Sequence, residues 1–287
     1  MNNHLTADVS PRATFDPRIL ARTLGSGWNG PPAPSTPDEF ECSSFKIRAA
    51  DSSGERSSAS VLIERMYATR GYSRTRLPED HCPNLLTLVA NDHRATIGTL
   101  TVGFDSNDGL LADDLFGDEV DQLRRAGYQV CEFTKLAMDT VAQSKPVLMA
   151  LFNLAYIYSH LIRGVDHLLI EVNPRHARFY ETMLGFTVIG PKRLNRRVNA
   201  PAVLLSLSFE HARENIARFG GRPELASIER SLYPHSFSAR EEAGIVNRLR
   251  RRFGDRAERS RFTPMRRSAI GATVQIPTEY STEAQFA

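Results

Sequence analysis

The pattern of hydrophobic and polar positions predicts a chain in which strands and helices follow one another. The segments 85–90 (LLTLVA) and 95–104 (ATIGTLTVGF) flank the turn residues Asn91-Asp92-His93, so together they predict a β-hairpin. The run 146–162 is mostly apolar and predicts a buried helix that ends at Gly164. Other expected strands are 44–50, 128–139, 167–172, 186–189 and 202–209, and other expected helices are 58–72, 112–127, 212–220 and 238–254.

One further helix is predicted by its two ends. In the stretch NPRHARFYETMLGF, Asn173 is a favourable N-cap and Pro174 suits the first helical position, where its missing N–H costs nothing. Gly185 suits the left-handed residue that commonly ends a helix. The stretch therefore predicts a helix of about three turns that lies between two strands.

The order of these elements predicts the fold class. Strands that alternate with helices in the second half of the chain indicate an α/β (α+β) fold, with a mixed sheet and helices packed on its faces. Residues 1–43 are rich in Pro, Ser, Gly and Asn and predict a disordered leader. The domain itself is expected at 44–210, and 211–287 is expected to form a helical, Arg-rich extension with a loose end.

Composition and charge narrow the class of protein. The chain has 287 residues, of which 41% are hydrophobic and 24% charged, as in ordinary globular proteins. Its three cysteines are far apart and fit neither a disulfide framework nor a zinc site, so we expect a reducing, cytoplasmic setting and no metal. No apolar run has the length of a membrane span. The net charge is only +3, yet nine arginines lie between Arg248 and Arg267.

Five segments together resemble a known family, namely MYATRGY (66–72), IGTLTVGFDSNDGLLADDLF (97–116), EFTKLAM (132–138), NPRHARFYETMLGF (173–186) and VNAPAVLLSL (198–207). In these segments the chain is similar to the long-chain N-acyl amino acid synthases of the FeeM type, relatives of the autoinducer synthases that share the GNAT acyltransferase fold. This resemblance implies a GNAT-like, splayed sheet and transfer of a long-chain fatty acyl group from acyl carrier protein to the α-amine of an amino acid.

Glu132 is the first candidate catalytic residue. It lies in a mostly apolar strand, where a carboxylate is costly to bury unless it is paired, solvated or used. Amide formation from an ammonium needs a base, and a carboxylate can serve directly or through one water. The resemblance implies a basic partner three positions on, which is Lys135. Because residues 132 and 135 of a regular strand face opposite sides, a β-bulge is needed to bring them together. A structural ion pair of Glu132 is the alternative.

The capped helix carries three further candidates. The resemblance to GNAT acyltransferases implies that Tyr180 protonates the departing thiolate, whereas core packing is the alternative role. Asn173 either caps its helix only or also binds the pantetheine arm of the donor. His176 lies one turn before Tyr180 and either contacts the thioester or covers the edge of the sheet.

The remaining candidates concern substrate binding. Arg70 and Arg74 suit the carboxylate of the amino acid or the phosphate of the carrier, because guanidinium groups bind both anions bidentately. Asp113 either binds substrate or only favours the first turn of its helix. Four apolar residues are candidates for the acyl pocket, with core packing as their default role: Phe133, Leu136, Phe152 and Tyr156.

The acyl donor is expected to be carrier-bound rather than coenzyme A. GNAT enzymes that use coenzyme A carry a Gly-rich loop whose N–H groups bind pyrophosphate at a helix start. The corresponding stretch, 137–150 (AMDTVAQSKPVLMA), has no glycine, and Pro146 removes one donor. No other cofactor is expected. The arginines of 248–267 could attract an acidic acyl carrier protein or a membrane surface, and no recognised motif favours nucleic acid.

Two other functions fit the same observations. One is an autoinducer synthase that uses an adenosylmethionine-derived amine. The other is a non-catalytic module that binds an acyl carrier or a lipid. The segments 173–186 and 198–207 favour the amino acid synthases.

Overall fold

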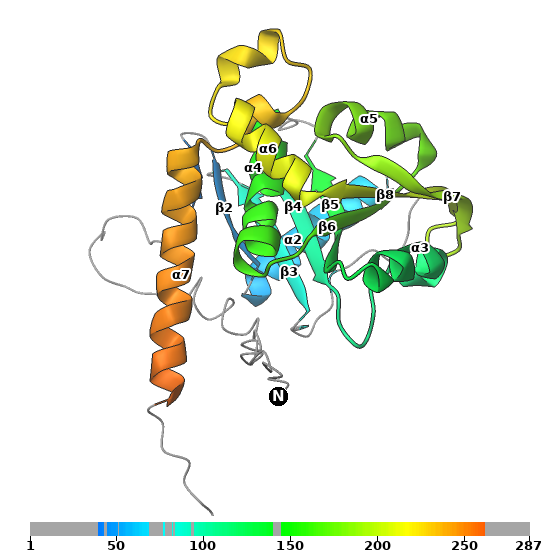
Figure 1. The fold of residues 1–287 in the computed structure, drawn as a ribbon, viewed down its shortest axis with the longest axis horizontal. Coiled ribbons are helices and arrows are strands. Elements are labelled where there is room, and N and C mark those ends of the chain that lie inside the picture. The colour runs from blue at the N-terminus through cyan, green and yellow to red at the C-terminus, as the bar shows by residue number, and fades with distance from the viewer. Residues whose placement is uncertain are drawn as a thin grey trace, which may run out of the picture.

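A computed structural model describes residues 40–42, 45–50, 52–68, 77, 82, 84–92, 95–139 and 145–261. In the segments 40–42 and 252–261 it describes the backbone alone. Figure 1 shows these residues as a central twisted sheet with helices around it and one long helix, α7, at the side.

The sheet is mixed, as expected. Within the described residues it has eight strands in the order β1-β2-β3-β4-β5-β6-β8-β7, and the β5–β6 pair is parallel while the other neighbours are antiparallel. β3 and β4 form the predicted hairpin. The strands are β1 (Phe40–Cys42), β2 (Phe45–Ala49), β3 (Leu85–Asn91), β4 (Thr96–Phe104), β5 (Val130–Met138), β6 (His167–Val172), β7 (Thr187–Asn195) and β8 (Ala200–Ser208).

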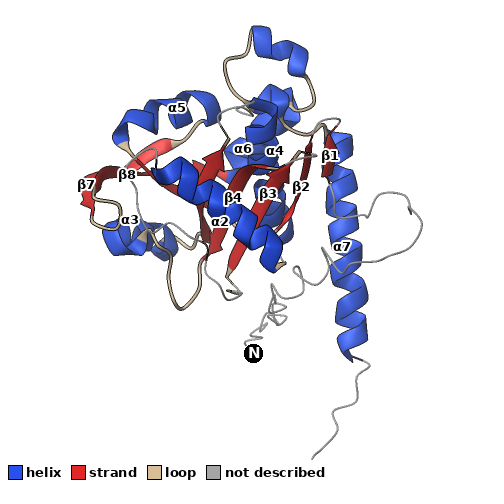
Figure 2. Cartoon of the chain, turned by 180° about the vertical axis from the view of Figure 1, so that it is seen from behind, coloured by secondary structure: helices blue, strands red, loops and turns tan. Residues whose placement is uncertain are grey.

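Helices cover both faces of the sheet, and this expectation is also confirmed. α2 and α3 bury their apolar residues against one face, and α4, α5, α6 and α7 bury theirs against the other. Figure 2 shows α2 in front of the sheet and α4 and α6 behind it. The helical elements are α2 (Ser53–Ala68), α3 (Asp113–Arg125), α4 (Lys145–Tyr156), the π-helix η1 (Ile157–Ile162), α5 (Pro174–Leu184), α6 (Phe209–Phe219), the 3₁₀ turns η2 (Pro223–Ser227) and η3 (Tyr233–His235), and α7 (Ala239–Arg261).

The predicted ends of α5 are confirmed in detail. The Asn173 side chain accepts a hydrogen bond from the N–H of Arg175 at 3.2 Å, and Pro174 occupies the first turn. Gly185 has φ of 79°, in the left-handed region, and its N–H returns to the carbonyl of Glu181. The position of α5 directly after β6 is therefore fixed by local capping chemistry.

The predicted buried helix is confirmed, with one change of geometry. α4 continues into the π-helix η1, and Gly164 follows with φ of 72°. Asn153 in its middle is fully buried, and its Oδ1 accepts a hydrogen bond from the N–H of Phe237 at 2.7 Å. A single π turn inside an α-helix is uncommon and is not visible in a hydrophobic pattern, because the extra residue changes the period only locally.

Up to residue 261 the C-terminal extension is helical, as expected, and it contributes to the core of the sheet domain, whereas 262–287, the expected loose end, lies outside the described residues. Buried residues of α6, η3 and α7 belong to the same apolar cluster as β4, β5 and α4. The Tyr233 hydroxyl donates to the carbonyl of Leu184 at 2.8 Å, so η3 is held to the end of α5. None of the helices in the described residues has the length and apolar character needed to cross a membrane.

Two boundaries differ from the expectation. β1 lies inside 1–43, the expected leader, because its backbone pairs with β2 at the edge of the sheet. The rest of that leader, 1–39, lies outside the described residues. β7 runs through Thr187–Asn195, well beyond the expected 186–189, because irregular register with β8 lets polar residues continue along an edge strand.

Candidate active site

β5 and β6 are joined over a short length only. Their parallel pairing runs from Val130–His167 to Glu132–Leu169 and stops there. β6 continues to Val172 while pairing with β8, and β5 continues to Met138 while pairing with β4. The two strands therefore diverge immediately after Glu132, which is the splay that the sequence predicted.

The predicted bulge lies in the same strand. Between the pairs Thr99–Ala137 and Thr101–Thr134, one residue of β4 faces two residues of β5, Lys135 and Leu136. Lys135 has φ of 50°, a left-handed conformation that is rare for a residue with a side chain. Its carbonyl accepts a hydrogen bond from the Thr99 hydroxyl at 2.9 Å, which holds the irregular turn of the backbone. Such backbone outliers gather at functional sites.

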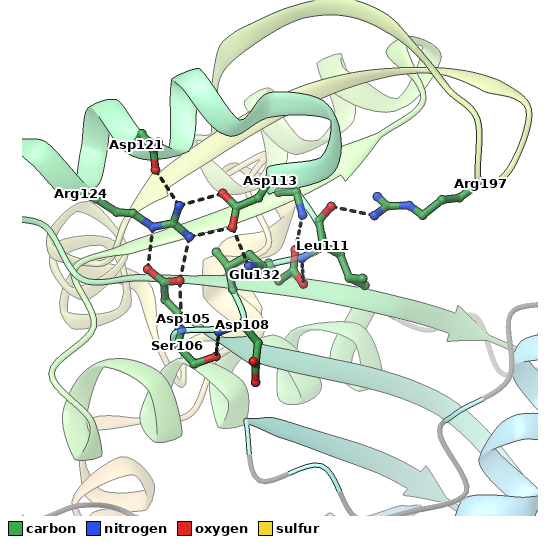
Figure 3. Close-up of polar contacts among 11 residues, drawn as sticks. Asp105, Ser106, Asp108, Leu111, Asp113, Asp121, Arg124, Glu132 and Arg197 are labelled. Carbon is green, nitrogen blue, oxygen red and sulfur yellow. Dashed lines mark hydrogen bonds and ion pairs between the residues drawn. The ribbon is translucent and has the colours of Figure 1, made fainter. Parts of the chain in front are cut away.

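Glu132 is buried and holds a loop. Its side chain has only 4% of its surface exposed. Oε1 accepts a hydrogen bond from the N–H of Leu111 at 2.9 Å, and Oε2 accepts one from the N–H of Ala112 at 3.0 Å (Figure 3). The loop that precedes α3 is thereby fastened to the central strand. Each carboxylate oxygen keeps a second lone pair, so these contacts leave acceptor capacity for a proton or a water.

Burial shapes the acid–base properties of the two candidate residues on β5. It raises the pKa of Glu132, against the N–H donors of Leu111 and Ala112 and the charges of Arg197 and Lys135, which lower it. Burial lowers the pKa of Lys135, against the charge of Glu132, which raises it. Glu132 and Lys135 therefore interact electrostatically, each favouring the charged form of the other.

Gly103 explains how the Glu132 side chain finds room. It pairs with Glu132 across β4 and β5. A Cβ at this position would lie 2.9 Å from Cγ and 3.0 Å from Oε1 of Glu132. The absence of a side chain at residue 103 is therefore a condition for the observed position of the carboxylate.

Asp113 has a structural place in this site. It accepts hydrogen bonds from the N–H of Leu110 at 2.6 Å and from Arg124 at 2.8 Å, and Arg124 also binds Asp105 at 2.7 Å (Figure 3). Burial alone would raise the pKa of Asp113, but the hydrogen bonds from Arg124 and Leu110 lower it. Both oxygens are occupied, so its position fits the helix-start alternative better than substrate binding.

The sequence reasoning missed Arg197. This residue lies in the turn between β7 and β8 and donates to the carbonyl of Leu111 at 2.7 Å, to Asp114 at 2.8 Å and to Glu171 at 2.8 Å. Asn195 supports the arrangement, because its amide donates to Glu171 and its Oδ1 accepts from the N–H of Arg197. The available signal was its place inside the segment shared with the family, next to VNAPAVLLSL.

The candidates on and before α5 lie beside the splay, because α5 starts where β6 ends. Tyr180 is half-buried and contacts the Phe186 ring edge to face at 5.7 Å. His176 is exposed and accepts a hydrogen bond from Arg175 at 3.1 Å. Asn173 caps the helix, which confirms its structural role. Asn173 thus lies at the end of β6, where that strand has parted from β5, and Tyr180 packs against the apolar cluster, as in its alternative role.

The four acyl-pocket candidates separate into two groups. Phe133 and Phe152 are buried and contact each other edge to face at 5.6 Å, and Leu136 packs against the same cluster. Tyr156 instead contacts the Phe209 ring at 5.5 Å, on the side of α6. All four belong to or pack against the same apolar cluster, which is the core packing given as their default role.

Two groups of arginines have different places. Arg70 and Arg74 lie outside the described residues. Of the arginines in 248–267, the structure describes the side chains of Arg248, Arg250 and Arg251, which are exposed. Figure 1 shows α7 at the side of the sheet, with its last turns extending past it.

The family model for the N-acyl amino acid synthase FeeM matches residues 58–208, which contain the splay, the bulge and the loop held by Glu132. This chain belongs to the FeeM family. It is an N-acyltransferase, and the resemblance drawn from its sequence motifs is confirmed.

The solved structure of FeeM agrees with this membership, and two further structures are similar to the chain. The structure of FeeM, an N-acyl amino acid synthase from uncultured soil microbes, is 27% identical over 59% of this chain and 93% of that chain, with a TM-score of 0.53. A putative N-acetyltransferase from Lactobacillus plantarum is 17% identical over 58% of this chain and 99% of that chain, with a TM-score of 0.44. The AHL synthase LasI is 11% identical over 57% and 89%, with a TM-score of 0.41. The fold is thus GNAT-like. A comparison with curated protein sequences found no match.

Proposed function

We propose that this member of the FeeM family transfers a long-chain acyl group from acyl carrier protein to the α-amine of an amino acid. The observation that carries the proposal is the family match over 58–208, which spans both borders of the splay. The FeeM structure is that of an N-acyl amino acid synthase, so an amino acid acceptor is the simplest extension to this chain.

The proposed reaction is direct attack of the amine on the thioester. The ammonium nitrogen loses one proton to Glu132, directly or through a water, and the neutral amine then forms a bond to the thioester carbonyl carbon. The tetrahedral oxyanion would be stabilised by N–H groups of β5 beyond Glu132, which β6 does not pair. The C–S bond then breaks, and the carrier leaves as a thiolate that takes up the second proton lost by the nitrogen, so that the products are an amide and a thiol. The raised pKa of Glu132 suits a carboxylate that must accept a proton.

Acyl carrier protein is supported as the donor by charges near the splay. α4 starts a few residues after β5 ends, and α5 starts directly after β6 ends. Three exposed basic residues lie on these helix starts, namely Lys145, Arg175 and Arg178. An acidic carrier would be attracted to this edge. Pro146, in the first turn of α4, leaves that helix start one N–H short for a coenzyme A pyrophosphate.

Reconstitution with purified components tests the proposal. The full chain is incubated with palmitoyl acyl carrier protein and a mixture of amino acids, and products are identified by mass spectrometry. The same reaction with palmitoyl coenzyme A serves as the donor control. N-acyl amino acids formed faster from the carrier than from coenzyme A are expected. Formation of acylhomoserine lactone from adenosylmethionine instead, or absence of any N-acylated product, would contradict the proposal.

A further inference from the structure

Arg197 lies where a small zwitterion would have to bind. Its guanidinium donates to the carbonyl of Leu111, and the N–H of the same residue donates to Glu132 (Figure 3). One residue thus separates this cation from the proposed base. An α-amino acid carries its ammonium and carboxylate on one carbon, so its two groups need a base and a cation that lie close together.

The three acceptors of Arg197 differ in how strongly other contacts and burial fix their positions. The carbonyl of Leu111 is fixed through its own N–H to Glu132. Glu171 has only 15% of its side chain exposed and is also bound by Asn195. Asp114 has 69% of its side chain exposed, and its contact with Arg197 is an ion pair at the surface. Exposed ion pairs contribute little to stability, so Asp114 is the acceptor that another carboxylate can replace.

The charges around Arg197 favour the same ligand. Three carboxylates, on Asp114, Glu132 and Glu171, lie with two cations, on Lys135 and Arg197. If the Asp114 side chain moves away from Arg197, the carboxylate of the ligand can pair with Arg197 in its place. The ammonium of the ligand then adds a third positive charge beside the three carboxylates. An amine without a carboxylate brings the ammonium group but has no group that can pair with Arg197.

We propose that the α-carboxylate of the acceptor amino acid binds Arg197 in the place that Asp114 occupies in the structure. This inference rests on the proposed function, because it assigns the carboxylate-binding residue of the same site. Asp114 acts as an internal competitor, and Arg197 selects free amino acids over amines and amino acid amides. Arg70 and Arg74 are not needed for this contact.

The test compares an amino acid with its primary amide as acceptors, using the acceptor that gives the best yield with the wild type. The wild type should prefer the acid. Arg197→Gln should raise KM for the acid about 10- to 100-fold, as expected for lost hydrogen bonds to a charged group, and leave KM for the amide nearly unchanged. Asp114→Asn should lower KM for the acid by about two- to fivefold, since an exposed ion pair no longer competes.

Arg193, on the same hairpin as Arg197, and its partner Glu119, on α3, provide the matched control. Arg193 binds Glu119 at 2.7 Å and the carbonyl of Leu115 at 2.7 Å, so it resembles Arg197 in its partners. Arg193→Gln and Glu119→Gln should leave the acid-to-amide ratio of KM values unchanged. A structural role for Arg197 alone would weaken both acceptors equally.

The outcomes separate the two proposals. If the wild type acylates no amino acid, the proposed function fails before any variant is made. If the wild type does so but Arg197→Gln keeps the preference for the acid, or Asp114→Asn leaves KM for the acid unchanged, only the assignment of the carboxylate site is overturned. Asp114 is exposed, so that variant remains informative even if Arg197→Gln folds poorly.

Discussion

Two carboxylates in this molecule, one buried and one half-buried, share a raised pKa and differ in their surroundings. Burial raises the pKa of both Glu132, on β5, and Glu242, on α7. Glu132 is satisfied by two backbone N–H groups at the point where the sheet opens. Glu242 lies between helices, and its Oε2 is buried without a hydrogen bond in the described part of the chain.

The comparison shows that a raised pKa does not identify an active site by itself. Structural groups are also buried and shifted, and Glu242 lies outside 58–208, the part of the chain that the family shares. The feature that distinguishes Glu132 is its place beside a splay, a bulge and a loop that its side chain holds. Three experiments test this distinction between Glu132 and Glu242.

Substitution of each carboxylate by its amide should give the largest contrast. Glu132→Gln should lower kcat for acyl transfer by about 10²- to 10⁴-fold, the usual contribution of a general base. Glu242→Gln should retain kcat close to the wild type, because Glu242 borders helices of the extension. Steady-state kinetics with acyl carrier protein measures both, and circular dichroism verifies that each variant is folded. Equal losses in the two variants would remove the catalytic role of Glu132.

A methyl group at residue 103 should disturb the same carboxylate without altering it chemically. Gly103→Ala places a Cβ against Glu132, and we expect activity to fall about 10- to 100-fold, the effect of a displaced catalytic group. Stability should fall by about 1–3 kcal/mol, as in overpacked cores. The matched control is Gly117→Ala in α3, where an added Cβ meets nothing within 4 Å. That variant should be as stable as the wild type or more so, and fully active.

The smallest effect concerns the pH dependence of folding. The pKa of Glu242 is higher in the fold than in the unfolded chain, so the folded state binds more protons between the two values. Stability should therefore fall as the pH rises through this window above 4.5. Glu242→Gln should weaken that decline and raise Tm at neutral pH. Thermal denaturation at several pH values measures Tm for the wild type and the variant. If Tm depends on pH in the same way in both proteins, burial of Glu242 does not cause the loss of stability at higher pH.

The sequence predicted the parts of the site that depend on residues close to one another in the sequence. The cap at Asn173 and the left-handed Gly185 follow from local chemistry, and the bulge was required by the spacing of Glu132 and Lys135. Arg197 could not be predicted in the same way, because its acceptors come from the loop before α3 and from β6. Such contacts depend on how β7 and β8 bring the turn to the loop. The ring contact between Tyr156 and Phe209 likewise depends on how α6 packs against α4.

The divergence of β5 from β6 has a consequence for solubility. Unpaired strand edges at the rim of a sheet tend to recruit strands of other molecules. Here the unpaired length of β5 lies in the interior of the sheet, with β4 on one side and β6 and β8 on the other. The N–H and C=O groups of β5 that an extended ligand could bind are therefore kept away from other copies of the protein. The sheet thus has unpaired backbone groups without the risk of aggregation that an exposed edge strand carries.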